Sequence, residues 1–269
     1  MNTKPLSLLR NPDLFSKLFL VLFCVAWFVF FHWKSLTNDL VINDDNAQHV
    51  AWMWQWKANN FQANDPMNLA AETLQQWGYL AVARVAMLVM TPIQFSKYMP
   101  LATLLVTCFF TYFLFKKRFG NAIGITAAVL LGFLTMERMT GFNGRAFAFP
   151  LLLGFLFYFT ERRWAGTAIL LVMSALFYPI VLLIELGMLG LEAAYQVFTL
   201  RKNGWQQLRS HRKTWLMLST VVLLSVAIPA IKSRQIANHP LLGHAYSKQE
   251  LLSLTVFGED GRVDFAHEM

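Results

Sequence analysis

The stretch LFSKLFLVLFCVAWFVFFHW (Leu14–Trp33) contains twenty residues and carries one charged side chain, that of Lys17. A helix of this length is about 30 Å long, which matches the hydrocarbon thickness of a lipid bilayer. Lys4, Arg10 and Lys17 give it the basic start of a signal peptide, but no small-residue cleavage site follows it. We therefore interpret it as an uncleaved membrane anchor.

The whole chain has the composition of a protein embedded in lipid. Of its 269 residues, 56% are hydrophobic and 14% are charged, whereas a typical soluble domain is about a quarter charged. The net charge of +8 does not indicate nucleic acid binding, because the basic residues lie in short clusters between apolar segments. Cys24 and Cys108 lie inside such segments, so we expect buried thiols and neither a disulfide nor a cysteine-based metal site.

Seven apolar segments are long enough, or nearly long enough, to cross a bilayer. They are Leu14–Trp33, Met99–Phe115, Ala122–Met136, Ala146–Thr160, Ala165–Tyr178, Ile180–Thr199 and Trp215–Ile231. Tyr178-Pro179 separates two of them, since proline disfavours helix at the residue before it; a single kinked helix is the alternative. Tyr79–Pro92 is also apolar, but it has about fourteen residues and contains Arg84. It fits an interfacial or re-entrant piece better than a crossing.

The distribution of lysine and arginine favours seven spans. If Tyr79–Pro92 does not cross, the clusters at Lys116–Arg118 and Arg201–Lys213 both lie in the cytoplasm with the N-terminus, as the positive-inside rule requires. If it crosses, both clusters lie outside. We therefore predict an all-α, polytopic transmembrane helix bundle over residues 1–231, in a bacterial inner membrane. Its extracytoplasmic parts are the first outer loop (34–98), with interfacial helices, the second outer loop (137–145) and residues 232–269.

The first outer loop contains the stretch INDDNAQHVAWMWQWKANN (Ile42–Asn60). Asn43 is a suitable N-cap for a helix that runs from Asp44 to about Asn59. Positions i, i+4, i+7 and i+11 of such a helix share one face. The residues at these positions are Asp45, His49, Trp52 and Trp56. Because tryptophan favours the head-group level, we expect this helix to lie along the membrane surface.

The pair Asp45 and His49 suits two kinds of chemistry. A carboxylate and an imidazole can each accept a proton and can each bind a divalent ion. Asp45 is therefore a candidate base or metal ligand near a lipid-linked substrate, and Asp44 is its neighbouring alternative. An interfacial helix with a solvated acidic first turn is the purely structural alternative.

The second outer loop, within MERMTGFNGRAF (Met136–Phe147), adds Glu137, Arg138 and Arg145. The planar fork of donors in a guanidinium group matches a phosphate. Arg138 and Arg145 are therefore candidates for binding the phosphate of a polyprenyl-linked substrate. The alternative is that both side chains snorkel at helix ends.

Glu185 and Glu192 lie in the sixth span, seven residues apart and thus on the same helix face. Ionisable residues within a span usually face the bundle interior or a cavity. We expect an internal hydrogen bond between Glu185 and a neighbouring helix, and a polar transport path is the alternative. The sequence contains no histidine metal motif, phosphate-cradling glycine loop or nucleophile elbow, which argues against soluble-type nucleotide chemistry.

The order of these features resembles the GT-C superfamily of integral-membrane glycosyltransferases, which includes oligosaccharyltransferases and protein O-mannosyltransferases. The resemblance rests on the anchor helix, on Asp45-x-x-x-His49, on the basic turn KKRFG (Lys116–Gly120) and on GRAFAFPLLLGFLFYFTERRW (Gly144–Trp164). It implies that a sugar passes from a polyprenyl-phosphate-linked donor to an acceptor on the extracytoplasmic face. The implied partners are membrane lipid and this donor, and no nucleic acid.

The resemblance also implies roles for individual residues. Asp45, or Asp44, matches the acidic residue of the first outer loop and Glu137 that of the second, and such residues carry catalysis or bind a divalent cation such as Mg or Mn. Where metal-dependent relatives place an aspartate, this chain has Asn143, so a metal-free, base-assisted transfer is the alternative. The implied substrate contacts are His49, Arg138, Arg145, Trp52 and Trp56.

Two other classes of function stay open. A transporter or flippase for a lipid-linked or small polar substrate would use Glu185 and Glu192, although no internal repeat supports one. A non-catalytic membrane scaffold would need none of these side chains. Members of the superfamily continue with further spans and often a soluble domain, so the resemblance implies a longer protein, of which residues 1–269 could be inactive alone.

Overall fold

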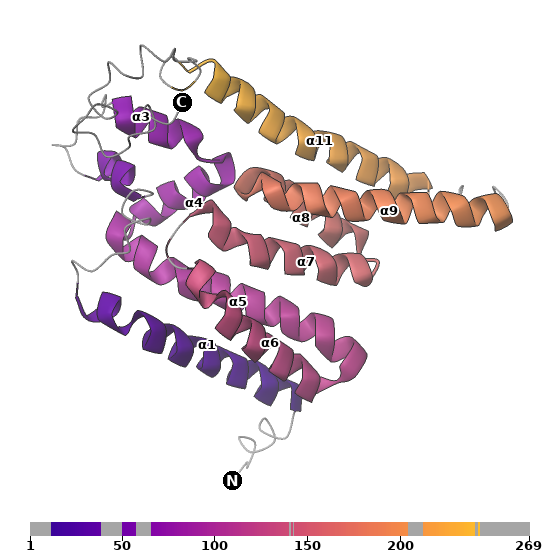
Figure 1. Cartoon of the computed structure of the whole chain (residues 1–269), viewed down its shortest axis with the longest axis horizontal. Coiled ribbons are helices and arrows are strands. Elements are labelled where there is room, and N and C mark those ends of the chain that lie inside the picture. The colour runs from indigo at the N-terminus through magenta and orange to yellow at the C-terminus, as the bar shows by residue number, and fades with distance from the viewer. Residues whose placement is uncertain are drawn as a thin grey trace, which may run out of the picture.

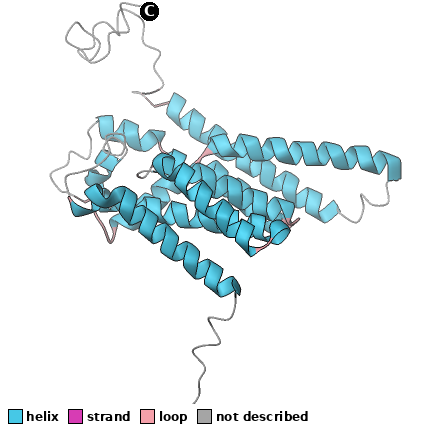
Figure 2. Cartoon of the chain, turned by 60° about the horizontal axis from the view of Figure 1, so that its bottom comes forward, coloured by secondary structure: helices cyan, strands magenta, loops and turns pink. Residues whose placement is uncertain are grey.

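The structure is a computed structural model that describes residues 12–38, 50–57, 66–139, 141, 143–203, 212–239 and 242. In these ranges the chain consists of helices and short connections, and they contain no strand (Figure 2). The prediction of an all-α protein is confirmed.

Seven apolar helices form the body of the described part of the chain (Figure 1). Four are long and apolar enough to span a membrane: α1 (Pro12–Thr37), α5 (Pro92–Phe119), α9 (Pro179–Asn203) and α11 (Arg212–Ala237). Three are shorter: α6 (Asn121–Thr135), α7 (Ala148–Thr160) and α8 (Trp164–Phe177). Each predicted apolar segment is thus a helix. Length and composition support a membrane crossing for four of these helices. The crossing of the other three, and with it the total of seven spans, stays a prediction.

Two features between the long helices agree with the sequence. Tyr178 has non-helical backbone angles (φ −151°, ψ 85°), so α8 ends at Phe177 and α9 begins at Pro179. The predicted break at Tyr178-Pro179 is therefore confirmed. The segment Tyr79–Pro92 contributes to α4 (Trp77–Met87), which has 11 residues. At 1.5 Å per residue α4 is about 16 Å long, too short to cross a bilayer.

The seven apolar helices alternate in direction along the chain, so the bundle has two ends (Figure 1). One end holds the start of α1, the α5–α6 turn and the α7–α8 turn; we call it the basic end, after Lys116–Arg118 and Arg162–Arg163. Among the described residues, three ion pairs join the helices there: Lys116 with Asp13 (Nζ to Oδ2, 2.6 Å), Lys117 with Glu161, and Arg162 with Glu192.

Short helices cover the opposite end, which we call the cap end (Figure 1). They are η2 (Trp52–Trp56), α3 (Pro66–Leu74), α4, η3 (Met136–Met139) and η4 (Gly144–Phe147). Lys97, near the start of α5, ties the last turn of α1 to this end. Its buried ammonium group donates to the carbonyl oxygens of Ser35 and Asn38, at 2.7 and 2.8 Å.

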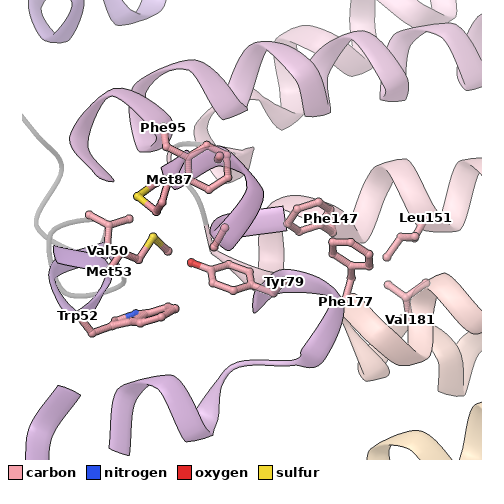
Figure 3. Close-up of a cluster of buried hydrophobic side chains, with 12 residues drawn as sticks. Val50, Trp52, Met53, Tyr79, Met87, Phe95, Phe147, Leu151, Phe177 and Val181 are labelled. Carbon is pink, nitrogen blue, oxygen red and sulfur yellow. The ribbon is translucent and has the colours of Figure 1, made fainter. Parts of the chain in front are cut away.

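In the part of the chain that the structure describes, buried apolar side chains form three clusters. The first, which we call the cap-end cluster, joins η2, α4, η4 and the α8–α9 break; Figure 3 shows its members, among them Val50, Trp52, Tyr79, Phe147 and Phe177. The second lies between α1, α5 and α6 and includes Cys24 and Cys108, which are buried free thiols as predicted. The third joins α7, α8, α9 and α11. The cap-end cluster positions the candidate site.

Candidate functional site

Asp44, Asp45 and His49 lie in the segment 39–49, outside the described residues. Both neighbours of this segment are described. Asn38 accepts the hydrogen bond from Lys97, and Val50 is buried in the cap-end cluster. The end of α1 and the start of η2, which flank the predicted catalytic residues in the sequence, therefore both lie at the cap end.

The described part of the predicted surface helix is a short, tight one. Residues 50 and 51 are α-helical, and Trp52–Trp56 form a 3-10 helix that ends before Lys57 rather than near Asn59. The rings of Trp52 and Trp56 meet edge to face, with centroids 5.0 Å apart, as their predicted shared face requires. Trp52, however, is 1% exposed and packs in the core beneath Trp56. Trp52 is therefore a core residue that Trp56 packs against, and its ring is not exposed to a substrate.

Three elements of the cap end meet at the carboxylate of Glu72 in α3. Its Oε2 accepts a hydrogen bond from Nε2 of Gln55 in η2, at 2.9 Å. Its Oε1 accepts one from Nη2 of Arg84 in α4, also at 2.9 Å. The guanidinium carbon of Arg84 lies 5.0 Å from the ring centroid of Trp56, in cation–π contact. The head of Arg84 is thus held between a carboxylate and an indole ring.

A groove of about 310 Å³ opens beside this network, lined by Trp56, Arg84, Met87 and Leu88. Arg84 supplies its charge, and Met87 and Leu88 supply an apolar wall. The outward face of α4 and the following turn continue this wall, because Val85, Leu88 and Val89 are 66%, 80% and 79% exposed. A charged groove beside an exposed apolar surface suits an amphipathic ligand.

Tyr79 lies beneath this network, at the centre of the cap-end cluster, with its hydroxyl directed toward Met53 (Figure 3). Burial raises the pKa of the Tyr79 phenol far above its ordinary value of about 10. The phenol therefore stays protonated at neutral pH. Its place in the structure is a packing role, and it is no candidate for a general base.

The second outer loop lies at the same end of the bundle. A Cβ atom on Gly144 in η4 would be 3.4 Å from the ring of Tyr178, and the rings of Phe147 and Phe177 lie 4.7 Å apart. The loop therefore packs against the α8–α9 break, and through Phe147 it joins the cap-end cluster that contains η2.

The predicted polar residues of this loop have different surroundings. Glu137, in η3, and Arg145, in η4, are exposed, and Arg138 lies in η3 with its side chain outside the described residues. Asn143 is buried, and its amide oxygen accepts a hydrogen bond from the backbone N–H of Ala146 at 3.1 Å. Asn143 is thus the N-cap of η4.

The described residues contain no group of three His, Cys, Asp or Glu side chains that could hold a metal ion. Glu137 alone among the predicted metal ligands is described, and its carboxylate is exposed at the cap end. In the predicted metal site, a Mg or Mn ion would be held by Glu137 together with Asp45 or Asp44. The approach of Glu137 to either aspartate stays a prediction.

Glu185 and Glu192 have separate local partners, although they lie on one helix. Glu185 is fully buried, and its Oε1 accepts a hydrogen bond from the Ser174 hydroxyl of α8 at 2.9 Å. The predicted internal hydrogen bond is confirmed. Glu192 lies at the basic end, where it pairs with Arg162 and accepts from Nε2 of Gln196 at 2.6 Å.

Sequence reasoning missed Gln55 and Glu72, and it noted Arg84 as a charge in an apolar segment without a role. One signal was present. An arginine in an otherwise apolar segment needs a counter-charge, and Glu72 is the acidic residue nearest to Arg84 in the sequence. Gln55 gave no such signal, since its neighbours are tryptophans and its partner lies 17 residues away.

Comparisons of the chain with models of known protein families, with curated proteins and with solved structures found no match. The function of the protein is therefore argued from the residues of the cap end themselves.

Proposed function

We propose that the protein is an integral-membrane glycosyltransferase, which moves a sugar from a polyprenyl-phosphate-linked donor to an acceptor at the cap end. One observation supports this most: both loops with predicted catalytic residues belong to one end of the bundle. The segment 39–49 begins and ends there, η4 packs there against the α8–α9 break, and η3 contacts η4. The clusters Lys116–Arg118 and Arg162–Arg163 lie at the opposite end, which the positive-inside rule assigns to the cytoplasm.

In the proposed reaction, the oxygen of an acceptor hydroxyl attacks the anomeric carbon of the donor sugar. Asp45 or Asp44 acts as the base that removes the proton of this hydroxyl. The bond between that carbon and the phosphate oxygen breaks, and its electron pair stays on the lipid phosphate. His49 orients the aspartate, and Arg138 and Arg145 stabilise the phosphate charge. Where a divalent cation is bound, Asp45 and Glu137 would hold it, and it would neutralise the same charge.

The test uses the full-length protein in vesicles, with tritium-labelled monosaccharides on undecaprenyl phosphate as donors and native membrane extract as the acceptor. Loss of a general base costs about 100-fold or more in rate, so Asp45→Asn and Asp44→Asn together should abolish most transfer. Asp13→Asn is the matched control, because it removes a carboxylate at the basic end. Undiminished transfer by the double variant would refute the proposed mechanism.

A transporter or flippase for a lipid-linked or small polar substrate is the second candidate, and Glu185 favours it. The side chain is fully buried between α8 and α9, and its Oε2 has no hydrogen-bond partner among the described residues. A buried carboxyl group with one unpaired oxygen can take up and release a proton or a cation. This function would depend on Glu185 and tolerate the loss of Asp45.

A further inference from the structure

The groove beside Arg84 has the features of a built binding site for an anion with an apolar tail. Its polar wall is the guanidinium group of Arg84, whose side chain is 64% exposed. The hydrogen bond to Glu72 engages one N–H of the guanidinium fork, which has five donors in all. The remaining donors border a groove of about 310 Å³, large enough for a phosphate head group.

The charge of the described residues around the groove is positive in balance. Arg84 lines it, and Lys57 is exposed directly after Trp56. Lys232 of α11 is 2% exposed and lies close enough to interact electrostatically with Glu72. Among the described residues, one carboxylate, that of Glu72, stands against these three basic side chains, and it already receives hydrogen bonds from Gln55 and Arg84. An incoming phosphate would therefore meet an excess of positive charge.

The groove is also organised before any ligand enters. Arg84 is fixed by Glu72 on one side and by the face of Trp56 on the other, and Glu72 is itself fixed by Gln55. Trp56 in turn rests on the buried ring of Trp52. Since a long arginine side chain normally loses conformational freedom on binding, this support leaves less entropy to be lost when a ligand arrives.

The apolar surface beside the groove identifies the kind of ligand. Val85, Leu88 and Val89 form an exposed patch on α4 and the turn after it, continuous with the Met87–Leu88 wall. A free phosphate ion would gain nothing from this patch, whereas the chains of a lipid would bury it. Tryptophan and arginine side chains also suit the level of lipid head groups.

We propose that this groove binds the phosphate head group of an anionic glycerophospholipid, with an acyl chain along Val85, Leu88 and Val89. Neither Arg84 nor Glu72 takes part in the proposed transferase reaction, so the lipid proposal does not rest on that reaction. Trp56, which lines the groove, is shared with the predicted substrate contacts. A bound lipid would join η2, α3 and α4 through Arg84 and so stabilise the cap end.

Native mass spectrometry of the full-length protein with added phosphatidylglycerol or phosphatidylcholine tests the proposal. Wild type should retain one phosphatidylglycerol at least tenfold more strongly than phosphatidylcholine. Arg84→Gln should lose this preference. Leu88→Glu, which leaves Arg84 and Glu72 in place but adds a negative charge to the wall, should lose it as well.

Arg162→Gln is the matched control, since Arg162 is also exposed, pairs with a carboxylate (Glu192) and lies over a tryptophan (Trp164), but at the basic end. It should keep the preference. Equal retention of phosphatidylglycerol by Arg84→Gln, Leu88→Glu and wild type would overturn the proposal. Equal affinity of wild type for phosphatidylglycerol and phosphatidylcholine would overturn it as well. Displacement by inorganic phosphate or by undecaprenyl phosphate at equal concentration would assign the groove to those ligands instead. Asp45→Asn should bind lipid normally, which separates this result from the transferase test.

Discussion

Gly78 and the ring of Phe177 approach so closely that a Cβ atom on Gly78 would lie 2.6 Å from Cε2 of Phe177. The same atom would lie 2.9 Å from the backbone oxygen of Leu176. The first turn of α4 is therefore packed directly on the last turn of α8, just before the break at Tyr178. Through this contact α8 determines where α4, and with it Arg84, lies at the cap end.

Gly78→Ala should destabilise the protein by about 1–3 kcal/mol, because a backbone atom cannot move aside as a side chain can. Thermal unfolding in detergent would measure this as a lower midpoint. Gly187→Ala is the control, since a Cβ atom on Gly187 meets nothing within 4 Å. Alanine is the better helix former, so this change should leave the midpoint unchanged or raise it. Equal midpoints for Gly78→Ala and wild type would show that α4 is not held by this contact.

Lys97→Met should weaken the junction between α1 and α5. Lys97 is 8% exposed and donates charged hydrogen bonds to the carbonyl oxygens of Ser35 and Asn38. Bonds of this kind contribute about 1.5–3 kcal/mol each, so a loss of about 3 kcal/mol is expected for the pair. Denaturant unfolding would measure it. Lys34→Met, at an exposed position, should change stability by less than about 0.5 kcal/mol.

The helices of the bundle were predictable because apolar length is itself the signal for a membrane helix. The start of α5 shows the limit of that signal. The apolar run predicts a start at Met99, but the helix begins at Pro92, where Thr91 and Gln94 form a capping box with hydrogen bonds of 3.2 and 3.0 Å. A criterion based on apolar length does not detect this polar first turn. The pattern Thr-Pro-x-Gln, however, is typical of a helix start.

The candidate site was less predictable than the bundle. The contact between Trp52 and Trp56 follows from helical spacing, which is local information. The bonds of Glu72 to Gln55 and Arg84 join three separate elements across 17 and 12 residues, and they depend on how those elements pack. The packing of short helices over one end of a bundle produces no periodic pattern of apolar residues in the sequence. The roles of Asp44 and Asp45 stay predictions.

Glu185→Gln should separate the two candidate functions. The amide keeps an oxygen that can accept the hydrogen bond from Ser174, but the side chain can no longer ionise. A glycosyltransferase that relies on the cap end should therefore keep its transfer rate. Its unfolding free energy should change by less than about 1.5 kcal/mol. A transporter that uses Glu185 should lose substrate flux into vesicles. Loss of transfer with a normal melting midpoint would contradict a purely structural role for this carboxyl group.

The two ends of the bundle should face opposite aqueous compartments, and cysteine labelling in sealed vesicles can show it. Cys24 and Cys108 are fully buried, so wild type should react little with an impermeant maleimide. Lys117→Cys, at the basic end, should react from one side of the membrane and Arg145→Cys, at the cap end, from the other, since both positions are exposed. Asn46→Cys should react from the same side as Arg145→Cys. Labelling of positions 46 and 145 from opposite sides would separate the two catalytic loops by the whole bilayer, and a single reaction could not use both.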